Sequence, residues 1–222
     1  MKTRIITIDG PAGAGKTTIS RLLSKKLGCV YVDTGALYRG AAYEIQRKGI
    51  DWENDDALES FLKNLDLNFL MENNSLILIS SGIDITDCIR TPEISMLASA
   101  SSAKPQVRKA LLGIQRNIAE TKDAVFEGRD MGTVVFPGAQ YKFFLFADLS
   151  VRAKRRYNEM QDVTKDINKV QEEMEIRDEN DYQRQTAPLK PAKDAIQIDA
   201  SFLTIEQVVE KMMKSIEKAW KA

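Results

Sequence analysis

Segment 10–17 carries the residues whose types and spacing point most directly to chemistry. Its sequence, Gly-Pro-Ala-Gly-Ala-Gly-Lys-Thr, matches the phosphate-loop pattern at every fixed position. In such a loop the glycines let successive backbone N–H groups point into one concavity, and the following helix adds the positive end of its dipole. Lys16 can reach the β- and γ-phosphates of a nucleotide, and the Thr17 hydroxyl can bind Mg²⁺. The segment therefore predicts a nucleoside triphosphate site, but it does not identify the acceptor of the phosphoryl group.

Two more polar segments follow short apolar runs and could reach the same site. Segment 33–39, Asp-Thr-Gly-Ala-Leu-Tyr-Arg, ends in Arg39, whose guanidinium could hold a phosphate through two parallel hydrogen bonds. Segment 127–137 begins Glu-Gly-Arg-Asp-Met-Gly and places Arg129 beside Asp130. In open α/β sheets ligands bind at the carboxyl ends of the strands, where both segments would lie. The simpler alternatives are a capped helix start for the first segment and a salt bridge in a surface loop for the second.

A third segment, 177–192, combines closely spaced charges with prolines. On a helix Arg177, Asp181 and Arg184 would share one face, because they are spaced four and three residues apart. This spacing is compatible with simple ion pairing along the helix, or with the presentation of two guanidinium groups and a carboxylate to a nucleotide. Pro188 and Pro191 would end the helix.

The surrounding pattern predicts which elements position these segments. Continuous apolar runs typical of buried parallel strands span residues 5–8, 29–32, 124–127, 142–147 and 195–198. Helical patterns span residues 18–27, 36–48, 55–65, 105–121 and 204–220. Thr204 and Gln207 form a capping box at the start of the last helix. We therefore expect an α/β fold with a five-stranded parallel sheet and helices on both of its faces.

Two regions depart from this alternation of strands and helices. Residues 66–87 contain three short apolar runs separated by turn-forming residues at 72–74 and 80–82, which predicts a small antiparallel insert. Residues 151–187 are densely charged, and a solvent-exposed helical face is the simplest explanation of that charge.

Composition narrows the class of protein. The 222 residues suffice for one α/β domain, and 32 Lys and Arg balance 32 Asp and Glu, which gives no support for binding to nucleic acid or to a membrane. The absence of histidine excludes His-based acid–base chemistry and His metal sites. Cys29 and Cys88 form no paired motif and are expected to be buried free thiols. No leader or membrane-spanning run is recognisable, so we expect a cytoplasmic protein. As a separate expectation, we take the protein to be a monomer.

Taken together, the motifs resemble those of the bacterial cytidylate kinases, within the nucleoside-monophosphate kinase group of phosphate-loop proteins. The resemblance rests on segments 10–17, 33–39, 105–108, 128–137 and 177–192, and it covers essentially the whole chain. The strings Gly-Arg-Asp-x-Gly-Thr-Val-Val-Phe-Pro and Pro-Leu-x-Pro-Ala-x-Asp are its most specific parts. It implies a single kinase domain with a phosphate-loop core (1–35, 104–150 and 187–222), a monophosphate-binding region that includes the insert (36–103) and a short helical lid (151–186).

The resemblance also implies roles for individual residues. ATP would contact the phosphate loop and the residue after it, namely Gly10, Pro11, Ala12, Gly13, Ala14, Gly15, Lys16, Thr17 and Thr18. CMP would be held at its cytosine by Ser99, Arg108 and Asp130, at its ribose by Asp181 and Arg184, and at its phosphate by Arg39, Arg129 and Arg177, with Thr34 and Tyr38 as further contacts. Catalysis would involve Lys16, Arg129, Arg177 and the lid arginines Arg155 and Arg156. Thr17 would bind Mg²⁺ together with ATP phosphates and water.

The implied reaction is transfer of a phosphoryl group from ATP to CMP or dCMP, giving CDP or dCDP and ADP. A phosphate monoester has a second pKa of about 6, so the acceptor is largely dianionic and needs no general base. Two alternatives remain open. A kinase of a small hydroxyl compound would use a carboxylate base, for which Asp33 or Asp130 could serve. A regulatory nucleotide switch would need no small acceptor, although the Asn-Lys-x-Asp motif of guanine binding is absent from this sequence.

Overall fold

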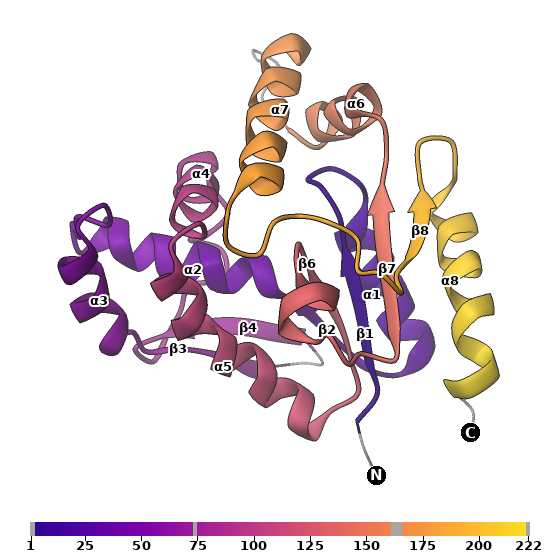
Figure 1. Cartoon of the computed structure of the whole chain (residues 1–222), viewed down its shortest axis with the longest axis horizontal. Helices are drawn as coiled ribbons and strands as arrows, with labels where there is room; N and C mark the ends of the chain where they lie inside the picture. Colours follow the sequence, from indigo (N-terminus) through magenta and orange to yellow (C-terminus); the bar gives the residue numbers. More distant parts are fainter. Residues whose placement is uncertain (1–2, 73–74, 161–165, 221–222) are drawn as a thin grey trace.

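A five-stranded parallel sheet forms the centre of the protein (Figure 1). The computed structural model of the chain describes residues 3–72, 75–160 and 166–220. The strands are β1 (Ile5–Asp9), β2 (Val30–Asp33), β6 (Ala124–Gly128), β7 (Tyr141–Phe146) and β8 (Ile196–Asp199). Their order is β2-β6-β1-β7-β8, and every neighbouring pair is parallel. The predicted sheet is confirmed. Because all its strands run the same way, the polar segments that follow β1, β2 and β6 meet at the carboxyl ends of the strands.

The two faces of the sheet bury different side chains, as alternation along parallel strands requires. Ile6, Ile8 and Val125 pack against helices α1 (Lys16–Leu27) and α8 (Ile205–Trp220). Phe126 lies on the opposite face, in a cluster with residues of α5 (Pro105–Thr121) and of a short π-helical turn, η1 (Met131–Val135). Helices therefore cover both faces, as expected.

The predicted capping box starts α8. The Thr204 N–H donates to Gln207 Oε1 at 2.9 Å, and the Gln207 N–H donates to Thr204 Oγ1 at 3.3 Å.

A second apolar core lies beside the sheet, among the helices and strands on the left in Figure 1. Helices α2 (Thr34–Arg47), α3 (Asp55–Lys63) and α4 (Pro92–Ser101) pack there with α5 and a small antiparallel sheet of β3 (Leu67–Glu72), β4 (Ser75–Ser80) and β5 (Ile83–Asp84). The small sheet confirms the predicted insert. Its second turn places Ser81 and Gly82 at φ 48° and 80°, the backbone of a tight two-residue hairpin. Its first predicted turn lies partly outside the described residues, at 73–74.

Helices α6 (Leu149–Glu159) and α7 (Ile167–Gln183) stand over the carboxyl edge of the sheet, at the top of Figure 1. They pack on each other through Ala153, Val170 and Met174. Between them Arg152 Nη1 lies 2.5 Å from Asp178 Oδ2 and also donates to the Ala12 carbonyl at 3.1 Å. Solvent exposure therefore does not account for all the charge in this region, because part of it joins the two helices to the phosphate loop.

Some sequence predictions need correction or addition. Cys29 and Cys88 are free thiols, but Cys88 is exposed and Cys29 only partly buried. Burial raises the pKa of the Cys29 thiol to about 12.

Helix α4 was not predicted, although Thr91 caps it through a hydrogen bond from the Ile94 N–H and Pro92 is its first residue. Among the described helices, none combines the length and the apolar composition needed to cross a bilayer.

Candidate active site

A cleft of about 800 Å³ opens at the carboxyl edge of the sheet and extends beneath α6 and α7. Nearly all the predicted site residues line it: Ala12, Gly13, Ala14, Gly15, Lys16, Thr17, Thr18, Thr34, Tyr38, Arg39, Ser99, Arg108, Arg129, Asp130, Arg155, Arg156, Arg177, Asp181 and Arg184. Gly10 and Pro11 do not line it and lie at the base of the phosphate loop. The fold thus brings together segments that are far apart in the sequence.

The phosphate loop owes its path to its glycines. Gly10, Gly13 and Gly15 have φ values of 150°, 72° and 94°, a range that L side chains rarely adopt. A Cβ atom on Gly10 would lie 1.9 Å from the Leu145 carbonyl oxygen, so only glycine lets the loop pass strand β7. The loop then enters α1, where the Ile19 N–H donates to the Gly15 carbonyl. This geometry leaves the first N–H groups of α1 available to an anion.

Lys16 lies folded over this loop and is almost fully buried. Its Nζ donates to the Pro11 carbonyl oxygen at 2.7 Å, and the residue is 4% exposed. Burial lowers the pKa of Lys16 to about 7, and repulsion from Arg129 and Arg177 adds to the effect. The ammonium group is therefore held where an arriving polyphosphate would stabilise its charge.

Glu127 was not singled out from the sequence, yet it lies beside Lys16 at the end of β6. Its carboxylate accepts hydrogen bonds from Thr17 Oγ1 at 2.9 Å and from the Tyr31 hydroxyl at 2.7 Å. Burial and the neighbouring Asp33 raise its pKa. Within the described ranges no three His, Cys, Asp or Glu side chains cluster as a metal site would require. A hydroxyl and one carboxylate suit Mg²⁺, which usually takes its other ligands from phosphates and water.

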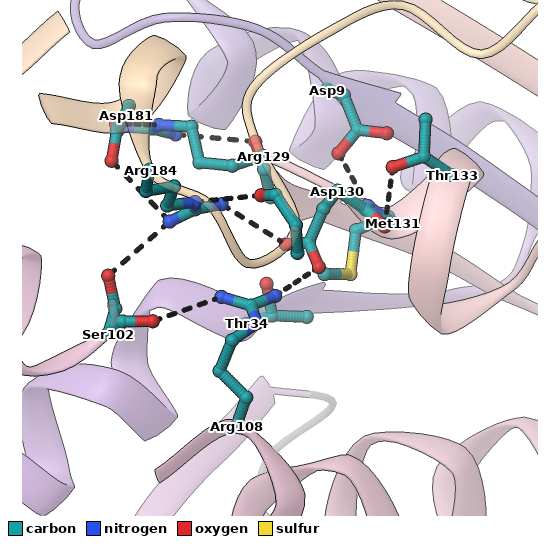
Figure 2. A network of polar contacts seen from close by, with 12 residues as sticks. Asp9, Thr34, Ser102, Arg108, Arg129, Asp130, Met131, Thr133, Asp181 and Arg184 are labelled. Atoms are coloured by element: carbon teal, nitrogen blue, oxygen red, sulfur yellow. Dashed lines mark hydrogen bonds and ion pairs between the residues drawn. The ribbon is translucent and has the colours of Figure 1, made fainter. Parts of the chain in front are cut away.

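At the other end of the cleft, two arginines converge on one carboxylate (Figure 2). Arg108, from α5, is in direct contact with Asp130 Oδ2, and Arg184 Nη2 lies 3.7 Å from Asp130 Oδ1. All three side chains are buried, with Asp130 only 2% exposed. Two positive charges around one buried carboxylate leave an excess of hydrogen-bond donors at this end of the cleft.

The same network continues toward the phosphate loop. Arg129 Nε donates to Asp181 Oδ2 at 2.9 Å, and Arg184 Nη1 lies 3.6 Å from Asp181 Oδ1. Burial alone would raise the pKa of Asp181, but the attraction of Arg129, Arg184 and Arg177 outweighs it and lowers that pKa. The predicted helical face of Arg177, Asp181 and Arg184 is only partly right. Helix α7 ends at Gln183, and Arg184 reaches Asp181 from the segment that follows the helix.

Several polar atoms at this site have no partner among the described residues. The buried Ser99 Oγ and the buried Nε of Arg177 are two of them. Burial and the nearby Arg129 lower the pKa of Arg177 to about 10, so it is still a cation at neutral pH. Buried groups without partners carry a cost in free energy, which a bound ligand would relieve.

Ser102 is a residue of this site that sequence reasoning missed. Its Oγ accepts a hydrogen bond from Arg184 Nη1 at 3.3 Å, and its carbonyl accepts one from Arg108 Nη1 at 3.5 Å (Figure 2). The Arg108 guanidinium also lies 5.4 Å from the centre of the Tyr38 ring. The position of Ser102 three residues after Ser99, at the end of α4, carries no signal in the sequence, because α4 itself was not predicted.

The remaining predicted arginines, Arg39, Arg155 and Arg156, line the cleft and differ in their partners and exposure. Arg39 Nη2 donates to Asp33 Oδ2 at 2.7 Å. Arg155 Nη2 donates to the Ala200 carbonyl at 2.6 Å, which links α6 to the segment after β8. Arg156 lies farther out, with Nη1 3.5 Å from Glu159 Oε2 and about half of its side chain exposed. Arg156 is thus the most exposed of these three cations, and its one ion pair with protein is long and solvent-exposed.

Comparison with known proteins places the chain in a family. A family model described as cytidylate kinase matches residues 6–218. The chain is 42% identical over 214 residues to a cytidylate kinase of Syntrophotalea carbinolica, covering 96% of this chain and 91% of the relative. It is 44% identical over 220 residues to one of Pseudomonas fluorescens, covering 97% and 96%. The chain belongs to the cytidylate kinase family.

Membership of the cytidylate kinase family confirms the resemblance drawn from the motifs. A shikimate kinase from Bacteroides thetaiotaomicron superposes with a TM-score of 0.51 at 14% identity, covering 96% of this chain and 98% of that protein. At so low an identity this likeness concerns the fold alone. It supports the description of the five-stranded sheet and its helices as a phosphate-loop kinase core.

Proposed function

We propose that the protein transfers the γ-phosphoryl group of ATP to CMP or dCMP, giving CDP or dCDP and ADP. The observation that carries this proposal is the buried network of Arg108, Asp130 and Arg184 in the same cleft as the phosphate loop. Its hydrogen-bonding groups suit a pyrimidine with an amino group, and the cytidylate kinases named above are relatives over nearly the full chain.

Recognition of cytosine is a matter of matching donors and acceptors. The exocyclic amine of cytosine is a donor, which suits the Asp130 carboxylate and the unpartnered Ser99 hydroxyl. Arg108 can donate to the ring nitrogen and the carbonyl of the base. Uracil carries a carbonyl in place of the amine, and that carbonyl would face a carboxylate. A site built to pair one polar group discriminates strongly against a ligand that lacks it.

The acceptor phosphate would lie between the base site and Lys16. Arg129, Arg177 and Arg39 are the cations placed to hold it, and the unpartnered Nε of Arg177 supports this assignment. Asp181 and Arg184 would then face the ribose. The Asp130 and Asp33 carboxylates that could act as bases toward an alcohol are each paired with an arginine. This pairing supports a phosphate acceptor, which needs no base, over a hydroxyl acceptor.

The cations of the cleft would promote transfer by offsetting the repulsion between two anionic nucleotides. Lys16 would hold the transferred group, and Arg155 and Arg156 of the lid would approach from α6 as charge develops on the phosphoryl oxygens. Thr17 and Glu127 would hold Mg²⁺ directly or through water, and the ion would neutralise phosphate charge. Enclosure by α6 and α7 would limit the access of water and so the wasteful hydrolysis of ATP.

The finer assignments follow the same logic. We place the core at residues 1–35, 104–150 and 187–222, the monophosphate-binding region at 36–103 and the lid at 151–186, of which 161–165 lie outside the described residues. The partners are small nucleotides, with no nucleic acid or membrane, and the protein is expected to act in the cytoplasm as a monomer.

A coupled assay of ADP release tests the proposal. The protein is incubated with ATP, Mg²⁺ and each of CMP, dCMP, UMP, AMP, GMP and shikimate in turn. We expect rapid ADP release with CMP and dCMP only. Release with shikimate alone would indicate a kinase of a hydroxyl compound, and slow release that no acceptor changes would indicate a nucleotide switch. Either result would overturn the proposal.

A further inference from the structure

A buried carboxylate joins the phosphate loop to the segment that carries Asp130. Asp9 is the last residue of β1, directly before Gly10, and it is 4% exposed. Its two oxygens accept hydrogen bonds from the backbone N–H groups of Met131 and Gly132, both at 2.8 Å. Figure 2 shows the contact with Met131. Asp9 does not line the cleft, so it has no direct access to a nucleotide there.

These two N–H groups belong to the start of η1, where a helical turn needs an external partner. The first N–H groups of any helix have no acceptor within the helix, and the preceding residue often supplies one from its own side chain. Here that residue is Asp130, whose side chain makes no such bond and is turned instead to Arg108. Asp9 therefore takes over the capping of η1, and Asp130 is left available for another role.

We propose that Asp9 is a positioning residue for the acceptor nucleotide: by capping η1 from strand β1, it holds Asp130 in fixed register with the phosphate loop. The inference rests on the proposed function, because it assigns Asp9 a part in cytosine recognition. One carboxylate bound by two adjacent N–H groups resists both shift and rotation of the turn. The backbone of Asp9 leads directly into Gly10 and the phosphate loop, while its side chain holds the segment that carries Asp130.

The ionisation of Asp9 suits this role. Burial raises its pKa to about 6, and the nearby Asp130 adds to the effect, while the two N–H bonds and Lys16 oppose it. At pH 7 the carboxylate is therefore mostly ionised, and both oxygens can accept. A buried charge is costly in free energy, so its retention with both oxygens on one turn points to a demand for fixed geometry.

Gly132 provides a second, independent way to disturb the same contact. A Cβ atom on Gly132 would lie 3.0 Å from Thr7 Oγ1 and 3.4 Å from Asp9 Oδ2. Gly132→Ala would thus push η1 away from β1 while leaving the Asp9 carboxylate in place. Asp9→Asn acts from the other side, because its amide group would face an N–H donor where a carboxylate oxygen now accepts.

The experiment measures kcat/KM for CMP and for UMP, and KM for ATP, in the wild type and both variants. We expect kcat/KM for CMP to fall at least about tenfold in Asp9→Asn while KM for ATP changes less than about twofold. The CMP-to-UMP ratio should fall with it. A purely structural role would lower the amount of folded enzyme and leave that ratio unchanged.

Gly132→Ala should lower the same ratio, and the double variant should lose less than the product of the two single losses. Asp123→Asn is the matched control, since Asp123 also accepts a backbone N–H, from Arg4 at 2.7 Å, before the amino end of β6. It should leave the ratio unaltered. If the ratio is unchanged in whichever of Asp9→Asn and Gly132→Ala folds, the inference is wrong. If wild-type enzyme does not phosphorylate CMP at all, the proposed function fails first.

Discussion

The two ends of the cleft are built in different ways. The proposed donor end consists of one continuous segment, in which backbone groups and a single lysine surround the place that we assign to the phosphates. The proposed acceptor end consists of side chains that pair with one another, most of them buried. They come from three distant segments, on α5, after β6 and around the end of α7. Backbone groups and a lysine can hold phosphates without contacting the base, whereas a site made of paired side chains can select one base.

The charged groups in the cleft also differ in how well the free protein stabilises their charge. Lys16 at the donor end and Arg177 at the acceptor end both have lowered pKa values, so their charge is poorly stabilised without a ligand. Asp130 and Asp181, by contrast, are paired with arginines already in the free protein. We infer that the paired groups hold the shape of the site and that the two cations with lowered pKa values, Lys16 and Arg177, gain most when phosphate binds.

The largest effect is expected at the donor end. Lys16→Met should lower kcat by about 10³-fold or more, because it removes the cation nearest the transferred group. Steady-state kinetics with CMP measures this loss. Lys142→Met is the control, since Lys142 is also buried but pairs with Asp194 at 2.8 Å outside the cleft. Lys142→Met should lower the melting temperature more than kcat. Equal losses of kcat in the two variants would remove Lys16 from the mechanism.

At the acceptor end, two arginine variants should affect activity alike but differ in the free energy of unfolding. Arg177→Met should lower kcat/KM for CMP by about 10- to 100-fold through a lost charge-assisted bond, with little change in the free energy of unfolding. Arg129→Met should cause a similar loss of activity and also destabilise the protein by about 1–3 kcal/mol, because Asp181 loses its closest partner. Urea unfolding of both variants measures the difference. Equal destabilisation would show that Arg177 is a structural group.

Glu127 tests the metal side of the donor end. Glu127→Gln should raise the Mg²⁺ concentration for half-maximal activity by about tenfold, because the Thr17 hydroxyl would lose a charged acceptor. Titration of activity with Mg²⁺ at saturating ATP and CMP gives the value. Tyr31→Phe removes only the second hydrogen bond to Glu127 and should shift the midpoint less. A midpoint that stays the same in Glu127→Gln would exclude Glu127 from the metal site.

The smallest predicted effect is the uptake of less than one proton per protein molecule when ATP binds. With a pKa of about 7 in the free protein, Lys16 is mostly neutral at pH 8. Binding of ATP would raise that pKa and draw a proton from the buffer, and below pH 6 the lysine is already charged and no uptake is expected from it. Calorimetric titration in two buffers of different ionisation enthalpy measures the uptake, with Lys16→Met as reference. Identical uptake by wild type and variant at pH 8 would contradict the lowered pKa.

The donor and acceptor ends of the cleft also differ in how far the sequence alone could predict them. The phosphate loop lies in one segment, and local physics (glycine turns, a helix start, a lysine) was enough to identify it. The five strands were also predictable, with each end within one residue of its observed position. Continuous apolar runs are typical of buried parallel strands, so the sequence alone indicates them. The pairing of Arg108 with Asp130, across 22 positions, exists only in the fold, and the sequence supplied those roles through resemblance alone.

The residues that were missed are the ones whose partners lie far away in the chain. Asp9 acts on a turn more than a hundred residues further along, at Met131, and nothing near it in the sequence indicates that contact. Glu127 and Ser102 likewise gain their partners from other elements. The expected burial of Cys88 was wrong for a related reason. Exposure depends on neighbours in space, and Cys88 lies in the segment between β5 and α4, open to solvent.

The most direct test of the account compares CMP with UMP as acceptors in wild-type protein and in Asp130→Asn, with diphosphate formation followed by chromatography. The asparagine keeps the size of the side chain, but its amide can donate to the carbonyl of uracil. We predict a strong preference for CMP in the wild type and a preference at least about tenfold weaker in the variant. An unchanged preference in Asp130→Asn would contradict it.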